Sequence, residues 1–182
     1  MDGSQTFRVG EKVVYPNHGV GVIETIANRV ISSPAGGGEQ QYYQLKIEAS
    51  NLRVMVPFTN VESVGMRRVT DARAMVPILT YLRNSERVEC ASDWKWRFKE
   101  NSDKMRNGAL AQVAEVLKSL VQLHQAKPLS YREKKMLDRA ALLLVGEMAS
   151  AENLSLERAL ELLQQTLAAA ELVLPPFDEE AS

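Results

Sequence analysis

The chain has 182 residues, enough for one large domain or two small ones, and 45% of them are hydrophobic, so a core can form. Its formal net charge of −1 excludes a generally basic surface for nucleic acid and confines any basic site to a local patch. No apolar run approaches the roughly 20 residues of a membrane span, and the start lacks a signal pattern. Cys90 is the single cysteine, so we expect no disulfide, a small buried thiol and a soluble cytoplasmic protein.

The first part of the chain has the pattern of a small β domain. β-Branched runs and alternating apolar and polar residues predict five short strands, at 12–15, 20–26, 28–32, 41–48 and 52–57. Glycines alternate with valines from Gly19 to Val22, which favours tight curvature. The Gly-rich stretch 33–39 predicts a flexible hairpin tip. These patterns predict a strongly bent antiparallel sheet or barrel over residues 7–67, with 13–15 inside.

From Thr70 the hydrophobic period becomes helical. Apolar stripes and capping residues predict five helices, at 71–83, 93–106, 110–121, 131–148 and 155–167. Pro77 is expected near the first turn of its helix, where its missing N–H costs least. Ser130 and Glu133 fit a capping box, and Gly108 suits a left-handed helix end.

The two patterns together predict an α+β protein of two domains. The β domain covers residues 7–67 and follows a flexible start at 1–6. A compact all-α domain covers residues 70–170. The remaining residues, 171–182, read as an acidic, disordered tail that the fold does not need.

The run DWKWRFK, residues 93–99, is the most informative motif. It holds the two tryptophans of the chain, Trp94 and Trp96, among three cations. Cations bind phosphate, and an exposed ring can stack on a base or wedge between base steps, so the run favours nucleic-acid binding. Residues two apart on a helix point about 200° from each other, which predicts one ring in the core and one exposed. The alternative interpretation is that the run forms an ordinary solvated helix face with no binding function.

No catalytic site can be assembled from the sequence. His18 and His124 lack metal-ligand spacing to a second histidine or cysteine. The Gly36-Gly37-Gly38 run lacks the Lys-Ser/Thr of a phosphate loop and precedes no predicted helix. We therefore expect a protein that is not an enzyme and that uses no metal, cofactor or small-molecule substrate.

The segment FRVGEKVVYPNHGVGVIETI, residues 7–26, resembles the opening of the CarD/CdnL family of bacterial transcription regulators. The likeness continues through YYQLKI, RVMVPFTNVESVGMR, WKWRFKEN, LAQVAEVLKSL, LSYREKKMLDRA and LLLVGEMA, in family order, over residues 7–170. The first block also occurs in the polymerase-binding module of the transcription-repair coupling ATPase. This chain has no helicase motif, so the combination with the helical half points to the regulator family.

The resemblance implies that residues 7–67 form a Tudor- or SH3-like barrel that binds the β subunit of RNA polymerase, partly by pairing strand edges. Some family members carry Arg where this chain has Met55, so the contact at Met55 would be apolar packing. The implied polymerase-binding residues are Arg29, Val30, Ile31, Val54, Met55, Val56 and Pro57.

The resemblance also implies that the helical half binds promoter DNA near the −10 element. Trp94 matches a tryptophan that enters the minor groove at the upstream edge of the open bubble and hinders reclosure of the strands. Trp96 stands where a relative has a basic residue, and packing is the favoured reading for it. The cations among the implied residues would contact phosphate and would not read bases. The implied DNA-binding residues are Trp94, Lys95, Trp96, Arg97, Lys99 and Lys134.

Two other binding functions stay open at this point. In the first, the barrel binds polymerase and the helices bind another protein instead of DNA. In the second, an SH3-like barrel binds RNA, although the loop from Ser33 to Gln40 carries no basic residue. We expect a monomer without a membrane partner, cytoplasmic and associated with the nucleoid through RNA polymerase.

Overall fold

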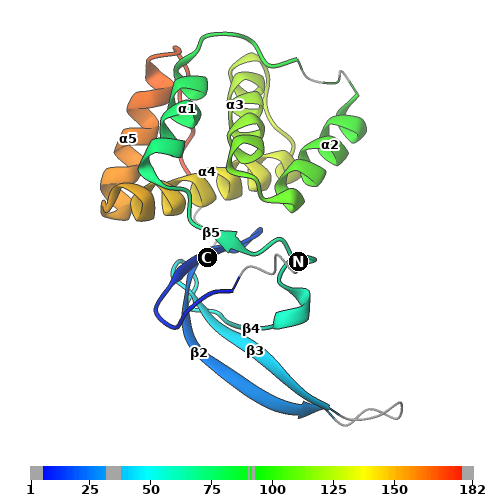
Figure 1. Cartoon of the computed structure of the whole chain (residues 1–182). Helices are drawn as coiled ribbons and strands as arrows, with labels where there is room; N and C mark the ends of the chain where they lie inside the picture. Colours follow the sequence, from blue (N-terminus) through cyan, green and yellow to red (C-terminus); the bar gives the residue numbers. More distant parts are fainter. Residues whose placement is uncertain (1–5, 32–37, 90, 92, 178–182) are drawn as a thin grey trace. The chain divides into compact units, whose positions relative to one another are not determined.

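The computed structural model describes residues 6–31, 38–89, 91 and 93–177. The chain divides between Val69 and Thr70 into two compact units, and each has its own hydrophobic core (Figure 1). The first unit is an antiparallel sheet and the second is helical, so the predicted α+β class with two domains is confirmed. The predicted hairpin tip at 33–39 lies largely outside the described residues, and Cys90 lies outside them altogether.

The sheet unit contains five strands and one short 3-10 helix. The sheet order is β4-β3-β2-β1-β5, and every pair of neighbours is antiparallel. The bounds are β1 Lys12–Tyr15, β2 Gly19–Ile31, β3 Gly38–Ile47, β4 Arg53–Pro57, η1 Phe58–Asn60 and β5 Arg67–Arg68.

Two features of the sheet differ from the sequence prediction. The predicted strands 20–26 and 28–32 form one strand, β2, whose register with β3 shifts between Ile23 and Thr25. β5 was not predicted, because two residues carry no alternation and only their pairing with β1 makes them a strand. Among the described strands β4 and β5 do not pair, so the sheet keeps two edges and is no closed barrel.

Aromatic packing and one close backbone approach bend the sheet around its core. The ring of Tyr43 stacks on Phe58 with centroids 4.0 Å apart, and its hydroxyl accepts a hydrogen bond from the Phe7 N–H at 3.1 Å. A Cβ atom at Gly21 would lie 3.0 Å from the Lys46 carbonyl oxygen, so a larger residue there would require the neighbouring strand to shift. The missing side chain thus lets β2 and β3 approach closely at this point.

The helical unit contains the five predicted helices. Their bounds are α1 Ala72–Arg83, α2 Trp94–Asn107, α3 Leu110–Ala126, α4 Tyr131–Glu152 and α5 Leu156–Ala168. The expected capping box of Ser130 and Glu133 is present, and Gly108 ends α2 with a φ of 73°. α3 contacts α1, α2 and α4, so its apolar stripe lies at the centre of this unit (Figure 1).

Two helix-level predictions are wrong. Pro77 is the sixth residue of α1 and lies beyond the first turn, on the exposed side of the helix. The segment after α5 is not disordered over 171–177, because Leu172 is buried and Leu174 and Phe177 pack against the helical core. The acidic composition of the tail concealed these apolar residues. Residues 178–182 lie outside the described part of the chain.

Two general features complete the fold. Among the described residues, no helix is both long and apolar enough to cross a membrane. Within the same ranges, no group of three His, Cys, Asp or Glu side chains gathers closely enough to hold a metal ion.

Candidate nucleic-acid interface

The N-cap and first two turns of α2 carry the DWKWRFK motif at the outer edge of the helical unit (Figure 1). The Asp93 side chain caps the helix and accepts hydrogen bonds from the N–H groups of Lys95 and Trp96, at 2.8 and 3.2 Å. A carboxylate at this position also suits the positive end of the helix dipole. Local sequence therefore determines where the helix starts and which residues form its first turn.

Both tryptophan side chains of this turn are exposed, Trp94 to 49% and Trp96 to 67%. The expectation that one ring lies in the core is wrong, and so is the packing role favoured for Trp96. The buried side of α2 begins only in the second turn, with Arg97, Asn101 and Met105. Neither ring is buried, so the helical spacing of Trp94 and Trp96 does not place one of them in the core.

Two exposed lysines accompany the rings. The Lys95 Nζ lies 5.9 Å from the centroid of the Trp94 ring, and the Lys99 Nζ lies 5.3 Å from that of Trp96. In the described part of the chain, neither lysine forms an ion pair with a carboxylate. Each cation thus remains available to a phosphate while it lies against a ring that can contact the sugar or base beside that phosphate.

Arg97 is not a DNA-facing residue, contrary to the prediction. Its side chain is 5% exposed and its guanidinium contacts the Glu133 carboxylate, with the Nη2–Oε1 distance 2.6 Å and the Nε–Oε1 distance 2.9 Å. Its Nη1 donates to the Ala91 carbonyl at 2.9 Å. Sequence position alone could not separate Arg97 from its exposed neighbours, because its burial depends on where α4 begins.

Glu133 is held as a carboxylate by its partners. Burial would raise the pKa of Glu133, but hydrogen bonds from Arg97 and from the Ser130 hydroxyl and N–H outweigh it and lower that pKa. One carboxylate oxygen accepts from Arg97 and the other from Ser130. The capping box of α4 and the first turns of α2 are thereby joined by one charged network, which sequence analysis recognised only as a helix cap.

Lys134 is also less available than predicted. Its side chain is 18% exposed, and its Nζ lies 2.8 Å from the Asp138 Oδ1 and 2.6 Å from the Pro176 carbonyl oxygen. The segment after α5 supplies that carbonyl, and the sequence offered no signal for the contact. The predicted set of cations therefore reduces to Lys95 and Lys99 as free charges on α2.

The predicted polymerase contact includes the far end of β2. Arg29 and Val30 are exposed, Val30 to 77%, and they pair with Gln40 and Glu39 of β3. The pairing of β2 with β1 ends at Val22, and Ile23 still hydrogen-bonds Gly10 and Glu11 on that side, so among the described residues β2 has only β3 as its neighbour beyond Ile23. The curved β2–β3 hairpin extends past the rest of the sheet (Figure 1). Ile31 ends β2 on the same free edge.

The second part of that contact is the edge strand β4. Val56 is 1% exposed and its side chain lies in the core, whereas Val54 is half-buried and packs against that core, so little of either side chain faces a partner. Ile47 N–H donates to the Leu52 carbonyl, and antiparallel pairs alternate, so the N–H and C=O of Met55 point to the free edge. Met55 also directs its side chain to the face opposite Val54 and Val56. Pro57 has no N–H to offer.

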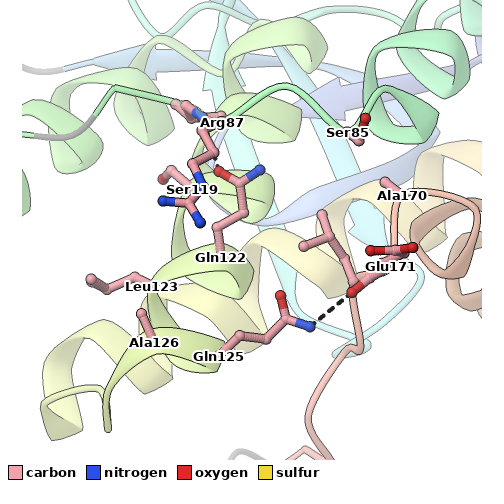
Figure 2. A pocket seen from close by; sticks show the side chains of 11 residues that line it. Ser85, Arg87, Ser119, Gln122, Leu123, Gln125, Ala126, Ala170 and Glu171 are labelled. Atoms are coloured by element: carbon pink, nitrogen blue, oxygen red, sulfur yellow. Dashed lines mark hydrogen bonds between the residues drawn. The ribbon is translucent and has the colours of Figure 1, made fainter.

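A shallow depression of 560 Å³ lies elsewhere on the helical unit, between α3, the α1–α2 linker and the segment after α5 (Figure 2). The Gln122 amide accepts from the Val88 N–H at 2.9 Å and donates to the Glu86 carbonyl at 3.0 Å. The Gln125 amide donates to the Glu171 carbonyl at 2.9 Å. These amides fasten both segments to α3, and the depression gathers no catalytic set of side chains.

Comparison with known proteins shows the family to which the chain belongs. The CarD-like/TRCF RID domain family matches residues 7–70, and the CarD C-terminal domain family matches residues 77–164. The chain therefore belongs to the CarD-like transcription factors, a family of regulators and not of enzymes. The chain is similar to a Bacillus subtilis (strain 168) protein named "Putative transcription factor YdeB". The two are 36% identical over 142 residues, which cover 78% of this chain and 90% of that protein.

Proposed function

We propose that the sheet unit binds the RNA polymerase β subunit while the first turn of α2 places Trp94 in the minor groove at the upstream edge of the open promoter. The observation that supports this most strongly is the pair of exposed tryptophans with two exposed lysines on the first two turns of one capped helix. The polymerase-interacting domain is a family property, and the free edges of β2 and Met55 suit strand addition. Association with polymerase would keep the protein in the cytoplasm.

The weak charge of the helical surface suits a factor that is tethered to polymerase. A few phosphate contacts give a Kd on the order of 10⁻⁴–10⁻⁶ M, too weak to select promoters unaided. A tether raises the local concentration to roughly millimolar, so that the same contacts suffice beside polymerase. Unstacking a base step costs a few kcal/mol, and polymerase has already melted the DNA at the junction, where a wedge therefore meets the least resistance.

Trp94→Ala tests the wedge, and Trp96→Ala is its matched control. We expect Trp94→Ala to shorten the lifetime of the open complex about tenfold, since stacking on a base is worth about 1–3 kcal/mol. Trp96→Ala should shorten the lifetime less than Trp94→Ala does, because the proposal places only Trp94 in the groove. Lifetimes are measured by competitor challenge, with association to polymerase checked for each variant. A Trp94→Ala protein that binds polymerase and prolongs the lifetime like wild type contradicts the proposal.

The alternative is that the helical unit binds another protein, because exposed tryptophans are also common at the centres of protein interfaces. Crosslinking to upstream promoter DNA separates the two functions. Under the proposal, crosslinking in the polymerase complex depends on Lys99. Under the alternative, a Lys99→Gln variant crosslinks no differently from wild type.

A further inference from the structure

We propose that Arg97 is a positioning residue, which together with Glu133 orients the tryptophan-bearing turn of α2 for DNA while contacting no DNA itself. This inference rests on the proposed function, because it concerns how the same turn meets the minor groove. Both residues are buried inside the helical unit and cannot touch DNA directly. The inference assigns them an indirect role in DNA binding.

The first argument is that Arg97 is the first buried side chain of α2. Trp94, Lys95 and Trp96 are all exposed, and the next buried residues, Asn101 and Met105, follow one and two turns later. No side chain of α2 before Arg97 is buried, so Arg97 is the first residue that fixes this turn in the interior of the unit. Its direction relative to the rest of the unit depends on the ion pair at its inner end.

The second argument is that the guanidinium joins three separate segments. Arg97 belongs to α2, its Nε and Nη2 donate to the Glu133 carboxylate in the first turn of α4, and its Nη1 donates to the Ala91 carbonyl in the linker before α2. Gln122 of α3 holds the same linker further upstream, at Glu86 and Val88. The chain that enters α2 is thus anchored at two points, and Arg97 is the anchor nearer the rings.

The third argument is that Glu133 is itself a fixed point. Its second carboxylate oxygen accepts from the Ser130 N–H at 3.0 Å and from the Ser130 hydroxyl at 2.8 Å. The carboxylate is 6% exposed and is bound at both oxygens, so it cannot follow a moving partner. Because Arg97 uses its donors inside the unit, a phosphate could bind it only after the pair had broken, which is costly for a buried pair.

Two substitutions separate positioning from phosphate contact. Glu133→Gln removes a negative charge from the helical unit, so simple electrostatics predicts equal or tighter binding to junction DNA, whereas positioning predicts weaker binding. Arg97→Lys keeps the positive charge at position 97, so a direct contact with phosphate would survive. If Arg97 instead positions the turn, the lysine should weaken DNA binding, because an ammonium cannot reproduce the planar set of hydrogen bonds that the guanidinium makes. We expect each variant to bind fork-junction DNA about tenfold more weakly.

The matched control is Glu100→Gln, the same chemical change at an exposed position of α2 where the carboxylate is 59% exposed. It should bind DNA at least as tightly as wild type. The salt dependence supplies a second readout. Lys99→Gln should lower the slope of log K against log salt by about 0.9, whereas Glu133→Gln should leave it unchanged.

Hydrogen exchange in the full-length protein without DNA tests the inference independently of the proposed function. Exchange at the Lys95, Trp96 and Arg97 N–H groups, which donate to Asp93, should rise at least about tenfold in both variants, while α3 and α5 stay protected as in wild type. Unchanged exchange at these three N–H groups, or wild-type DNA affinity in both variants, overturns the inference. If wild type does not bind junction DNA at all, the proposed function fails, and the exchange result still decides whether Arg97 orients the turn.

Discussion

Glu171 adopts a backbone conformation that its side chain disfavours. Its φ is 59°, in the left-handed region, whereas the other described non-glycine residues with positive φ are Asn17, Asn51 and Asn153. Asparagine tolerates this region and glutamate does not. Glu171 follows the end of α5, where the Leu172 N–H donates to the Leu167 carbonyl, a helix ending that favours glycine.

Glu171→Gly should therefore stabilise the protein. We expect the free energy of unfolding of the helical unit to rise by about 0.5–1 kcal/mol, because the strain removed exceeds the added freedom of the unfolded chain. The hydrogen bond from Gln125 uses the backbone carbonyl and survives. Urea denaturation measures the effect. Glu171→Ala removes the same charge but keeps a Cβ, and it should give no such gain.

The Glu133 carboxylate should make stability depend on pH in the acidic range. Its pKa in the folded protein lies below its ordinary value of 4.5, so its contribution is complete above that value and is lost as the pH falls toward the folded pKa. The difference in unfolding midpoint between wild type and Glu133→Gln should therefore be constant from about pH 7 to pH 5 and shrink toward about pH 3. A difference that is independent of pH would show that the pair contributes nothing through ionisation.

At the scale of elements, the free edge of β2 is the part of the sheet unit best placed to bind a partner strand. Val30 is 77% exposed on that edge, whereas Val9, in the turn before β1, is 59% exposed and lies on no strand. Val30→Asp should weaken association with the polymerase β subunit at least about tenfold, because a bound partner would bury an unpaired charge. Val9→Asp, the matched control, should bind like wild type in the same pull-down. An equal loss of polymerase binding in both variants would show that β2 is not part of the interface.

At the scale of the whole molecule, the proposed activity requires both units on one chain. Each unit has its own core, and the Glu147 carboxylate holds the start of the helical unit by accepting from the N–H and hydroxyl of Thr70. Cleavage at an engineered protease site between Val69 and Thr70 should leave both units folded, yet abolish the longer open-complex lifetime. The cause is the loss of the millimolar effective concentration that the tether supplies. A cleaved protein as active as the intact one would exclude the tethering mechanism.

Local chemistry is why so much of the fold could be predicted. Each signal used in the prediction affects only the few residues around it. These signals are the change from a two-residue to a helical period, the caps at Asp93 and Ser130, and the glycine at Gly108. They therefore specify the five helices and the class of fold. The family resemblance rested on the same ordered segments. That resemblance predicted a polymerase-interacting domain and a CarD C-terminal domain, and the family comparison confirmed both.

The tertiary structure decided which side chains are available at the candidate site. The exposure of Trp96 depends on where α2 extends beyond its neighbours, and the burial of Arg97 depends on Glu133, 36 residues away in the chain. The pairing of β5 with β1 and the contact of Pro176 with Lys134 also join segments that lie far apart in the chain. The sequence by itself determined the elements and the family, because periodicity and capping are local. Burial and pairing at the site belong to long-range packing, so only the folded structure separated the exposed Trp94 turn from the Arg97 that orients it.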